Sequence, residues 1–161
     1  PKPGLVMHIG GKFTTSRSDS TEIVDTVFKL LGRRSPRSVT HAQCLPGAPP
    51  EPFEHWQSEA IAELVHAGVD TEASRWLSLR HGTGIRAILA LIEERPALAQ
   101  RIDARAPFIR AEAVHAVRAE MAGSIDDVVR RRMPLSLLIG DQAWRPALLQ
   151  LLRAERPDIA V

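Results

Sequence analysis

The stretch Ala111-Glu-Ala-Val-His-Ala-Val-Arg-Ala-Glu-Met-Ala122, followed by Ser124-Ile-Asp-Asp-Val-Val-Arg-Arg-Arg132, indicates the fold of this chain most directly. In its first half, apolar residues recur at the spacing of one helical face and predict a helix over about 109–121. The residues of this face are Ala113, Val114, Val117 and Met121. Ser124, with Asp127 three residues later, is typical of a helix start, so a second helix is expected over 125–132.

The same apolar periodicity continues on both sides of this stretch. Further helices are expected over 56–68, 71–79, 85–92 and 144–153. Because the connections between them are short, neighbouring helices should pack antiparallel in a bundle over 54–161. Three tryptophans fall on predicted apolar stripes, which favours a place in the core or in an interface: Trp56, Trp76 and Trp144.

Towards the N-terminus, the proline-rich residues 36–53 predict an irregular linker. A helix with one buried face is expected before it, from Asp19, with Glu22 as a capping partner, to Leu31, with Gly32 after its end. We therefore expect three parts, namely residues 1–35, the linker and a helical domain over 54–161. The fold class is mainly α.

The chain opens with a short apolar run, Leu5 to Ile9, which predicts the only strand. Gly10-Gly-Lys-Phe-Thr-Thr15 follows it and leads into the first helix. Glycines allow close approach of the backbone to a ligand, and the first amides of a helix favour a negative charge. This strand–turn–helix corner is therefore expected to face an anionic or electron-rich group, although a lysine in a glycine turn is more often an ordinary surface residue. So few residues precede the corner that we expect the chain to be the C-terminal piece of a larger protein.

Composition narrows the function. Apolar residues make up 44% of the 161-residue chain and its net charge is only +2, which is typical of a globular protein that does not bind nucleic acid. The single cysteine, Cys44, cannot form an internal disulfide, and no apolar stretch is long enough to cross a bilayer. A cytoplasmic location is expected.

Several stretches together resemble one family, the flavin-dependent glycerol-3-phosphate dehydrogenases and the related oxidases. Residues 10–17 resemble the loop with which these enzymes close their FAD domain, and residues 111–122 and 124–132 resemble the signature of their C-terminal helical domain. Leu45-Pro-Gly47 and Arg80-His-Gly82 match by position and order. Ser16 and His81 stand where the family usually has tyrosines.

The resemblance implies oxidation of glycerol 3-phosphate to dihydroxyacetone phosphate, with a hydride passing to FAD. It implies that Lys12 is catalytic and lies beside flavin and substrate. The implied cofactor-binding residues are Gly10, Gly11, Lys12, Phe13, Thr14 and Thr15. The resemblance also implies a quinone or another electron acceptor, and leaves open a homodimer and a peripheral position on the inner face of the cytoplasmic membrane.

The remaining motifs give little indication of a metal site, an anion site or catalysis by this chain alone. Glu112 and His115 have the Glu-x-x-His spacing of di-iron bundles, but such sites also need two further glutamates on facing helices, so no metal site is expected. Residues 130–132 are three arginines that diverge around a helix, so we expect pairing with Asp126, Asp127 or Glu120. Because the chain has no glycine-rich nucleotide fingerprint, it should be inactive alone and should not bind FAD tightly. The alternative is a helical interaction module without catalytic activity.

Overall fold

The computed structural model describes residues 3–161 and is mainly helical, as expected. The chain divides into two compact units, residues 1–46 and 47–161, which are described separately below. The domain boundaries expected from the sequence, at 35 and 53, stay a prediction. None of the helices within 3–161 combines the length and the apolar character needed to cross a membrane.

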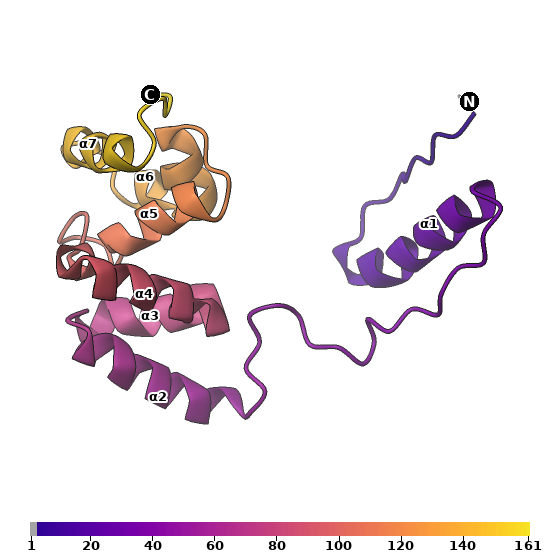
Figure 1. The fold of residues 1–161 in the computed structure, drawn as a ribbon, viewed down its shortest axis with the longest axis horizontal. Coiled ribbons are helices and arrows are strands. Elements are labelled where there is room, and N and C mark those ends of the chain that lie inside the picture. Colours follow the sequence, from indigo (N-terminus) through magenta and orange to yellow (C-terminus); the bar gives the residue numbers. More distant parts are fainter. Residues whose placement is uncertain (1–2) are drawn as a thin grey trace. The chain divides into compact units, whose positions relative to one another are not determined.

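The N-terminal unit contains one long helix (Figure 1). A 3₁₀ turn, η1 (Phe13–Thr15), leads directly into α1 (Ser16–Leu30). The end of α1 is as predicted, because Gly32 has φ +65° and the Arg33 N–H donates to the Phe28 carbonyl oxygen at 2.9 Å. The expected start at Asp19 is wrong: its carboxylate lies within the first turn, 2.9 Å from the Thr15 hydroxyl.

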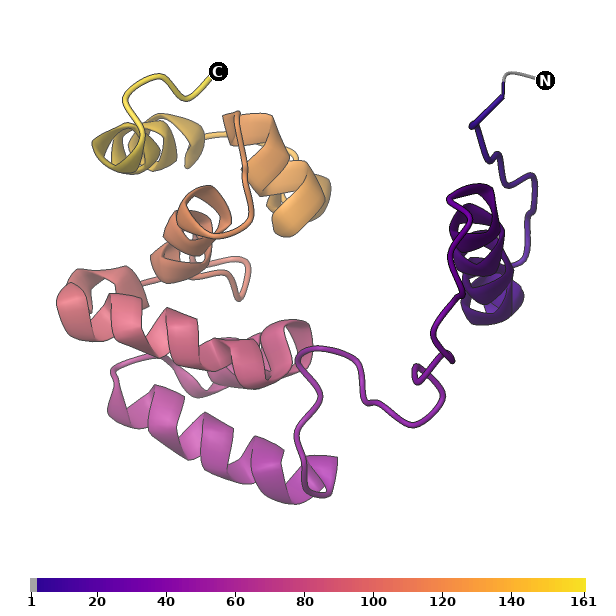
Figure 2. The ribbon, with the colours of Figure 1, turned by 45° about the vertical axis from the view of Figure 1, so that its right-hand side comes forward.

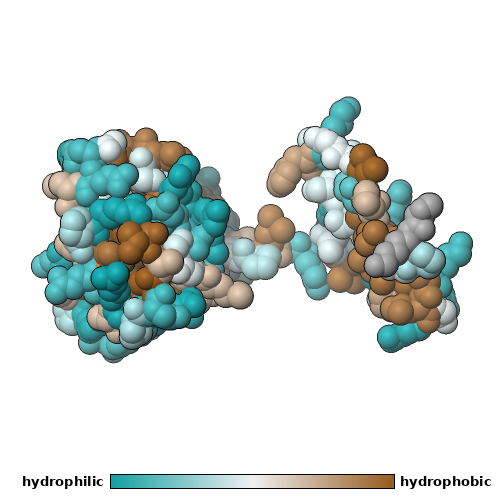
Figure 3. Space-filling model, turned by 90° about the horizontal axis from the view of Figure 1, so that it is seen from above, coloured by the Kyte–Doolittle hydropathy of each residue, from teal (hydrophilic) through white to brown (hydrophobic). Residues whose placement is uncertain are grey.

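Two further expectations for this unit are corrected. Residues 5–9 form no strand, since a strand requires a hydrogen-bonding neighbour and residues 3–161 contain no sheet. The apolar face of α1 is not buried either: Val24, Val27 and Leu30 are exposed, and α1 has no buried residue. The space-filling view shows apolar side chains on the surface of this unit (Figure 3).

The C-terminal unit contains all the other helices. The α-helices are α2 (Phe53–His66), α3 (Thr71–His81), α4 (Ile85–Glu94), α5 (Arg110–Arg118), α6 (Leu135–Leu138) and α7 (Arg145–Glu155). Shorter or irregular helical segments are η2 (Gly82–Gly84), η3 (Pro96–Ala99) and η4 (Asp127–Arg132). The helices α2, α3 and α4 pack side by side, and α5 packs against both α4 and α7 (Figure 2).

The core consists of two apolar clusters, and α5 contributes to both. Leu64, Leu77 and Ile88 belong to the cluster of α2, α3 and α4, which also takes Val114 from α5. The second cluster gathers residues from η4, α6 and α7 and takes Ala113 from the opposite side of α5. Helix α5 therefore lies between the two clusters, and its side chains are close to the middle of this unit.

Burial of the tryptophans only partly follows the prediction. Trp56 and Trp144 are buried in the two clusters. Trp76, by contrast, is 47% exposed on the outer face of α3. The apolar stripe expected for this helix therefore reaches the core through Leu77 rather than through the indole.

The stretch that predicted the fold forms both of its helices, with differences in detail. The first ends at Arg118, and Met121 lies beyond it with φ +58° and is 88% exposed, so its predicted core position is wrong. Ser124 and Asp127 do form the expected start, with reciprocal N–H···O bonds of 3.0 Å. The helix that follows widens to a π-helix in η4, where the Met133 N–H donates to the Val128 carbonyl oxygen.

Candidate functional site

The predicted cofactor-binding residues, Gly10 to Thr15, lie on the surface of the N-terminal unit and are all exposed. Lys12 is extended and directly precedes η1, whose Thr15 N–H donates to the Lys12 carbonyl oxygen at 3.3 Å. The Thr15 hydroxyl lies 3.1 Å from the same oxygen. The loop therefore turns sharply into the helix, and the turn presents the Lys12 side chain to solvent.

The surroundings of this loop are apolar. Met7, Ile9 and Phe13 are each more than two-thirds exposed. His8 is the polar exception, with Nε2 3.4 Å from the Asp19 carboxylate, and its ring lies so close to Gly10 that a Cβ there would come within 2.6 Å. Gly10 therefore has a local steric reason to be glycine, whereas a Cβ at Gly11 would meet no atom within 4 Å among the described residues.

A second polar centre lies inside the C-terminal unit, around Glu112 of α5. Its side chain is only 1% exposed and accepts hydrogen bonds from Arg80 Nε at 2.9 Å and from His81 Nε2 at 3.0 Å. The Ile109 N–H donates to it at 3.0 Å, which satisfies one of the free amides at the start of α5. A buried carboxylate is stable only when charged and hydrogen-bonded partners surround it, and here α3 supplies them.

Arg80 is itself fixed by further contacts. Its Nη2 donates to the Pro107 carbonyl oxygen at 2.8 Å, and its guanidinium carbon lies 4.5 Å from the centre of the Phe108 ring. The arginine therefore joins the C-terminal end of α3 to the loop before α5.

The chain after His81 is held by a contact between two glycines. Gly82 has φ +51°, and a Cβ built on it would lie 2.0 Å from the Gly47 carbonyl oxygen, which also accepts the Thr83 N–H at 2.9 Å. Gly47, the Arg80-His-Gly82 stretch and Glu112 are thus brought together from the three separate stretches that carried the resemblance within this unit. The spacing of Glu112 and His115 gave no sign of this arrangement.

His115 lies beside this network. Its ring is 6.0 Å from that of His81, and its Nε2 is 3.7 Å from the Glu120 carboxylate. Burial lowers the pKa of His115, and the nearby Glu120 opposes this shift only in part. Glu112 does not share a partner with His115 as a bridging carboxylate would; it turns towards Arg80 and His81 instead.

The three arginines at 130–132 diverge as predicted. Arg131 pairs with Asp127, and Arg132 Nη2 donates to the Glu120 carbonyl oxygen at 2.7 Å. Asp126 pairs instead with Arg145 of α7, at 2.8 Å. Arg131 and Arg132 therefore bind separate partners within the unit rather than one common anion.

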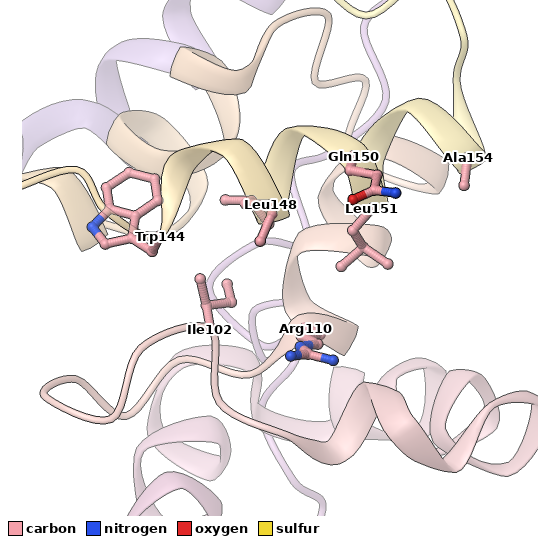
Figure 4. Close-up of a pocket in the computed structure, with 8 residues that line it drawn as sticks. Ile102, Arg110, Trp144, Leu148, Gln150, Leu151 and Ala154 are labelled. Carbon is pink, nitrogen blue, oxygen red and sulfur yellow. The ribbon is translucent and has the colours of Figure 1, made fainter.

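A cleft of about 390 Å³ lies between α7 and the start of α5 (Figure 4). Trp144, Leu148 and Leu151 line its α7 side, and Arg110 reaches into it from α5. Its lining, all within the described chain, contains no acid, histidine or cysteine, so it offers no pair for acid–base chemistry.

Comparison with known proteins assigns the chain to a family. Residues 38–155 match the C-terminal domain of alpha-glycerophosphate oxidase. The chain belongs to this family. It is 35% identical over 140 residues to a glycerol-3-phosphate dehydrogenase of Synechocystis, covering 87% of this chain and 25% of that protein. No solved structure matches it.

Other relatives are also glycerol-3-phosphate dehydrogenases. The chain is 31% identical to glycerol-3-phosphate dehydrogenase 2 of Mycobacterium tuberculosis, covering 85% of this chain and 23% of that protein. It is 29% identical to a mitochondrial glycerol-3-phosphate dehydrogenase of Arabidopsis thaliana, covering 89% of this chain and 24% of that protein. The chain thus spans about a quarter of the length of these relatives. The resemblance read from residues 10–17 and 111–132 is confirmed at the level of the family.

Sequence reasoning missed the buried carboxylate of the C-terminal unit, Glu112. Arg80 and His81 were noted only as a family match, and Glu112 only as half of a metal motif. The separation of 32 residues between Arg80 and Glu112 hides their pairing from any periodicity. Glu112 also lies outside the apolar face predicted for this helix, so no local pattern signalled its burial.

Proposed function

We propose that this chain is the C-terminal part of a flavin-dependent glycerol-3-phosphate dehydrogenase and that its Gly10–Thr15 loop forms one wall of the flavin and substrate site. The observation that carries the proposal is the exposed lysine in a double-glycine turn at the start of α1, in a chain of this family. When bound, FAD would accept the hydride from C2 of glycerol 3-phosphate.

The loop fits such a group. Gly11 leaves open space where a side chain would stand. Among the described residues, the amides of Phe13 and Thr14 donate no hydrogen bond, so they are free for an electron-rich ring edge at the start of the helix. The apolar side chains of Ile9 and Phe13 on either side would be covered by the remainder of a flavin domain.

Lys12 supplies the charge in this proposal. Its ammonium group would bind the substrate phosphate or stabilise the negative charge that develops on the reduced cofactor. The other residues of this loop, from Ile9 to Ser16, are uncharged, so Lys12 provides its only cation. The lysine ammonium is compact and mobile, which suits either task.

The proposal extends to the partners expected from the family. The electron acceptor would be a quinone or another oxidant, and the protein would act as a homodimer or attach peripherally to the cytoplasmic membrane. Residues 1–161 alone would be inactive, since they would supply only one side of the flavin and substrate site. A helical interaction module remains the alternative function.

The test uses the whole protein of which this chain is part. It is purified, its visible flavin spectrum is recorded without oxygen, and glycerol 3-phosphate is added. We expect the flavin to bleach, and we expect Lys12→Ala to slow bleaching by about 100-fold or more, the usual effect of losing one charge-stabilising group. Lys29→Ala, in the last turn of α1, is the matched control and should bleach at the wild-type rate.

A colourless whole protein would support the interaction module instead. A yellow protein that does not respond to glycerol 3-phosphate would reject the substrate, and normal bleaching of Lys12→Ala would reject the role of the lysine. Residues 1–161 expressed alone should be colourless; a yellow product would overturn the expectation that this piece is inactive.

A further inference from the structure

Next to the Glu112 network lies a group of potential metal ligands. His81, His115 and Glu120 each offer one ligand atom, and these atoms lie within 4.8 Å of one another. The sequence gave no reason to join them, because they come from the end of α3, from α5 and from the turn after α5. We propose that they form a site for a transition-metal dication, with zinc as the best fit.

The ligand types suit zinc. Two imidazoles and one carboxylate are the protein ligands of many zinc sites with three protein ligands, in which water takes the fourth position. The three side chains are 16%, 16% and 35% exposed, so the site is open to solvent on one side and walled on the other. An ion could enter and keep one water molecule.

Glu112 supplies the second observation. A histidine that binds a metal usually donates its other ring N–H to a carboxylate, which fixes the ring orientation and the tautomer. His81 Nε2 makes this contact with Glu112 Oε1 at 3.0 Å, which leaves the second ring nitrogen of His81 for a metal. Because Arg80 and the Ile109 N–H hold Glu112 in place, the first ligand is orientated before any ion arrives.

The second and third ligands need only a small adjustment. The distance from His115 Nε2 to the Glu120 carboxylate is 3.7 Å, close to the separation of about 3.4 Å between two ligands that each bind a tetrahedral zinc at about 2.0–2.1 Å. Side-chain rotation at Glu120, which is the most exposed of the three, can draw the set together.

The charges around the site are balanced without an ion. Arg80 pairs with Glu112, and Arg132 Nε lies 3.8 Å from the Glu120 carboxylate. An incoming dication would therefore compete with Arg132 for Glu120. This competition predicts moderate affinity, and an exchangeable rather than a permanently bound ion.

A second group, Glu51, His55 and Glu59, offers a comparison within the same molecule. All three residues are exposed on one side of the start of α2, and the His55 ring already lies 3.3 Å from Glu51 and 3.8 Å from Glu59. It has one imidazole and no buried carboxylate behind it, so it should bind zinc much more weakly.

The experiment measures metal binding to the whole protein, independently of any oxidation reaction. Zinc is titrated against a chromophoric chelator, and cobalt is titrated while its visible d–d absorption is recorded. We expect one site of moderate affinity per chain, with the intense cobalt bands of a four-coordinate ion. Glu120→Gln and His115→Gln should weaken zinc binding at least 10-fold, and the matched control His55→Gln should leave it unchanged.

Each outcome of these titrations either supports or overturns the proposed metal site. Glu120 is partly exposed, so Glu120→Gln should fold even if a histidine variant does not, and thermal melts of the metal-free variants verify this. No binding to the wild type, or equal binding to wild type and Glu120→Gln, would overturn the proposal. Loss of binding in His55→Gln alone would assign the metal to α2 and would overturn it as well.

Discussion

At the scale of single residues, Glu112 shows how a charge is kept inside a helical core. Its carboxylate is satisfied by a guanidinium and an imidazole from the end of α3 and by a backbone amide from the start of α5. The arrangement is costly to build, because three polar groups leave water. Once it is built, removal of one partner leaves the others buried without compensation.

Replacing Glu112 by alanine tests this account. We expect a loss of about 3–5 kcal/mol in the free energy of unfolding, the usual cost of breaking a buried ion pair from one side. The measurement is urea denaturation followed by circular dichroism. Glu93→Ala, an exposed glutamate on the neighbouring helix α4, is the control and should change stability by less than about 0.5 kcal/mol. Equal curves for the two variants would contradict a structural role for the network.

At the scale of elements, the junction between α3 and α4 depends on one glycine. Gly82 has a positive φ and faces the Gly47 carbonyl oxygen, whereas Gly84, in the same short turn, has φ −62° and its nearest neighbour would lie 3.9 Å from a Cβ. Two glycines two residues apart are therefore under different constraints.

Alanine at each glycine separates these constraints. Gly82→Ala should destabilise the protein by more than about 2 kcal/mol, because a strained backbone conformation and a backbone clash add together. Gly84→Ala should be neutral or stabilising by up to about 1 kcal/mol, since alanine restricts the unfolded chain. Thermal unfolding of the two variants side by side checks both values; a mild Gly82→Ala would mean that the segment around Gly47 moves away at little cost.

The helices also mark the limit of prediction from sequence. Apolar periodicity and end signals located α2, α3, α4 and α7, because both act within a few residues. The partner of Glu112, the exposure of Met121 and the π-helix of η4 depend on contacts far along the chain, and no local pattern carried them. The prediction of a strand at residues 5–9 was wrong for the same reason, since a strand forms only beside a hydrogen-bonding neighbour.

At the scale of the whole molecule, arginine–carboxylate pairs tie the C-terminal unit together and set its response to acid. A hydrogen bond from Arg101 lowers the pKa of Asp70 to about 2, and one from Arg105 lowers the pKa of Asp103 to about 2. The unfolded chain binds protons on these carboxylates near its ordinary pKa of 3.8. Each depressed pKa therefore contributes stability above pH 4 that is lost as the pH falls from about 4 to about 2.

Asp70 permits a direct test, because it has two separable roles. Its Oδ1 accepts the Ala73 N–H at 3.0 Å at the start of α3, and its carboxylate also pairs with Arg101. Asp70→Asn keeps an oxygen for the helix start and removes the titrating charge. Since the Asp70 side chain is 44% exposed, solvent screening limits the expected loss at pH 6 to below about 1 kcal/mol.

The difference between wild type and Asp70→Asn should shrink as the pH is lowered through 4 and should approach zero only below pH 2, where the wild-type carboxyl becomes protonated in the folded as well as in the unfolded state. Urea denaturation of both proteins at several pH values from 6 to below 2 measures this difference in the free energy of unfolding. A difference that stays constant with pH would assign the whole effect to the helix start. The pair with Arg101 would then fix the position of the loop before α5 without stabilising the fold.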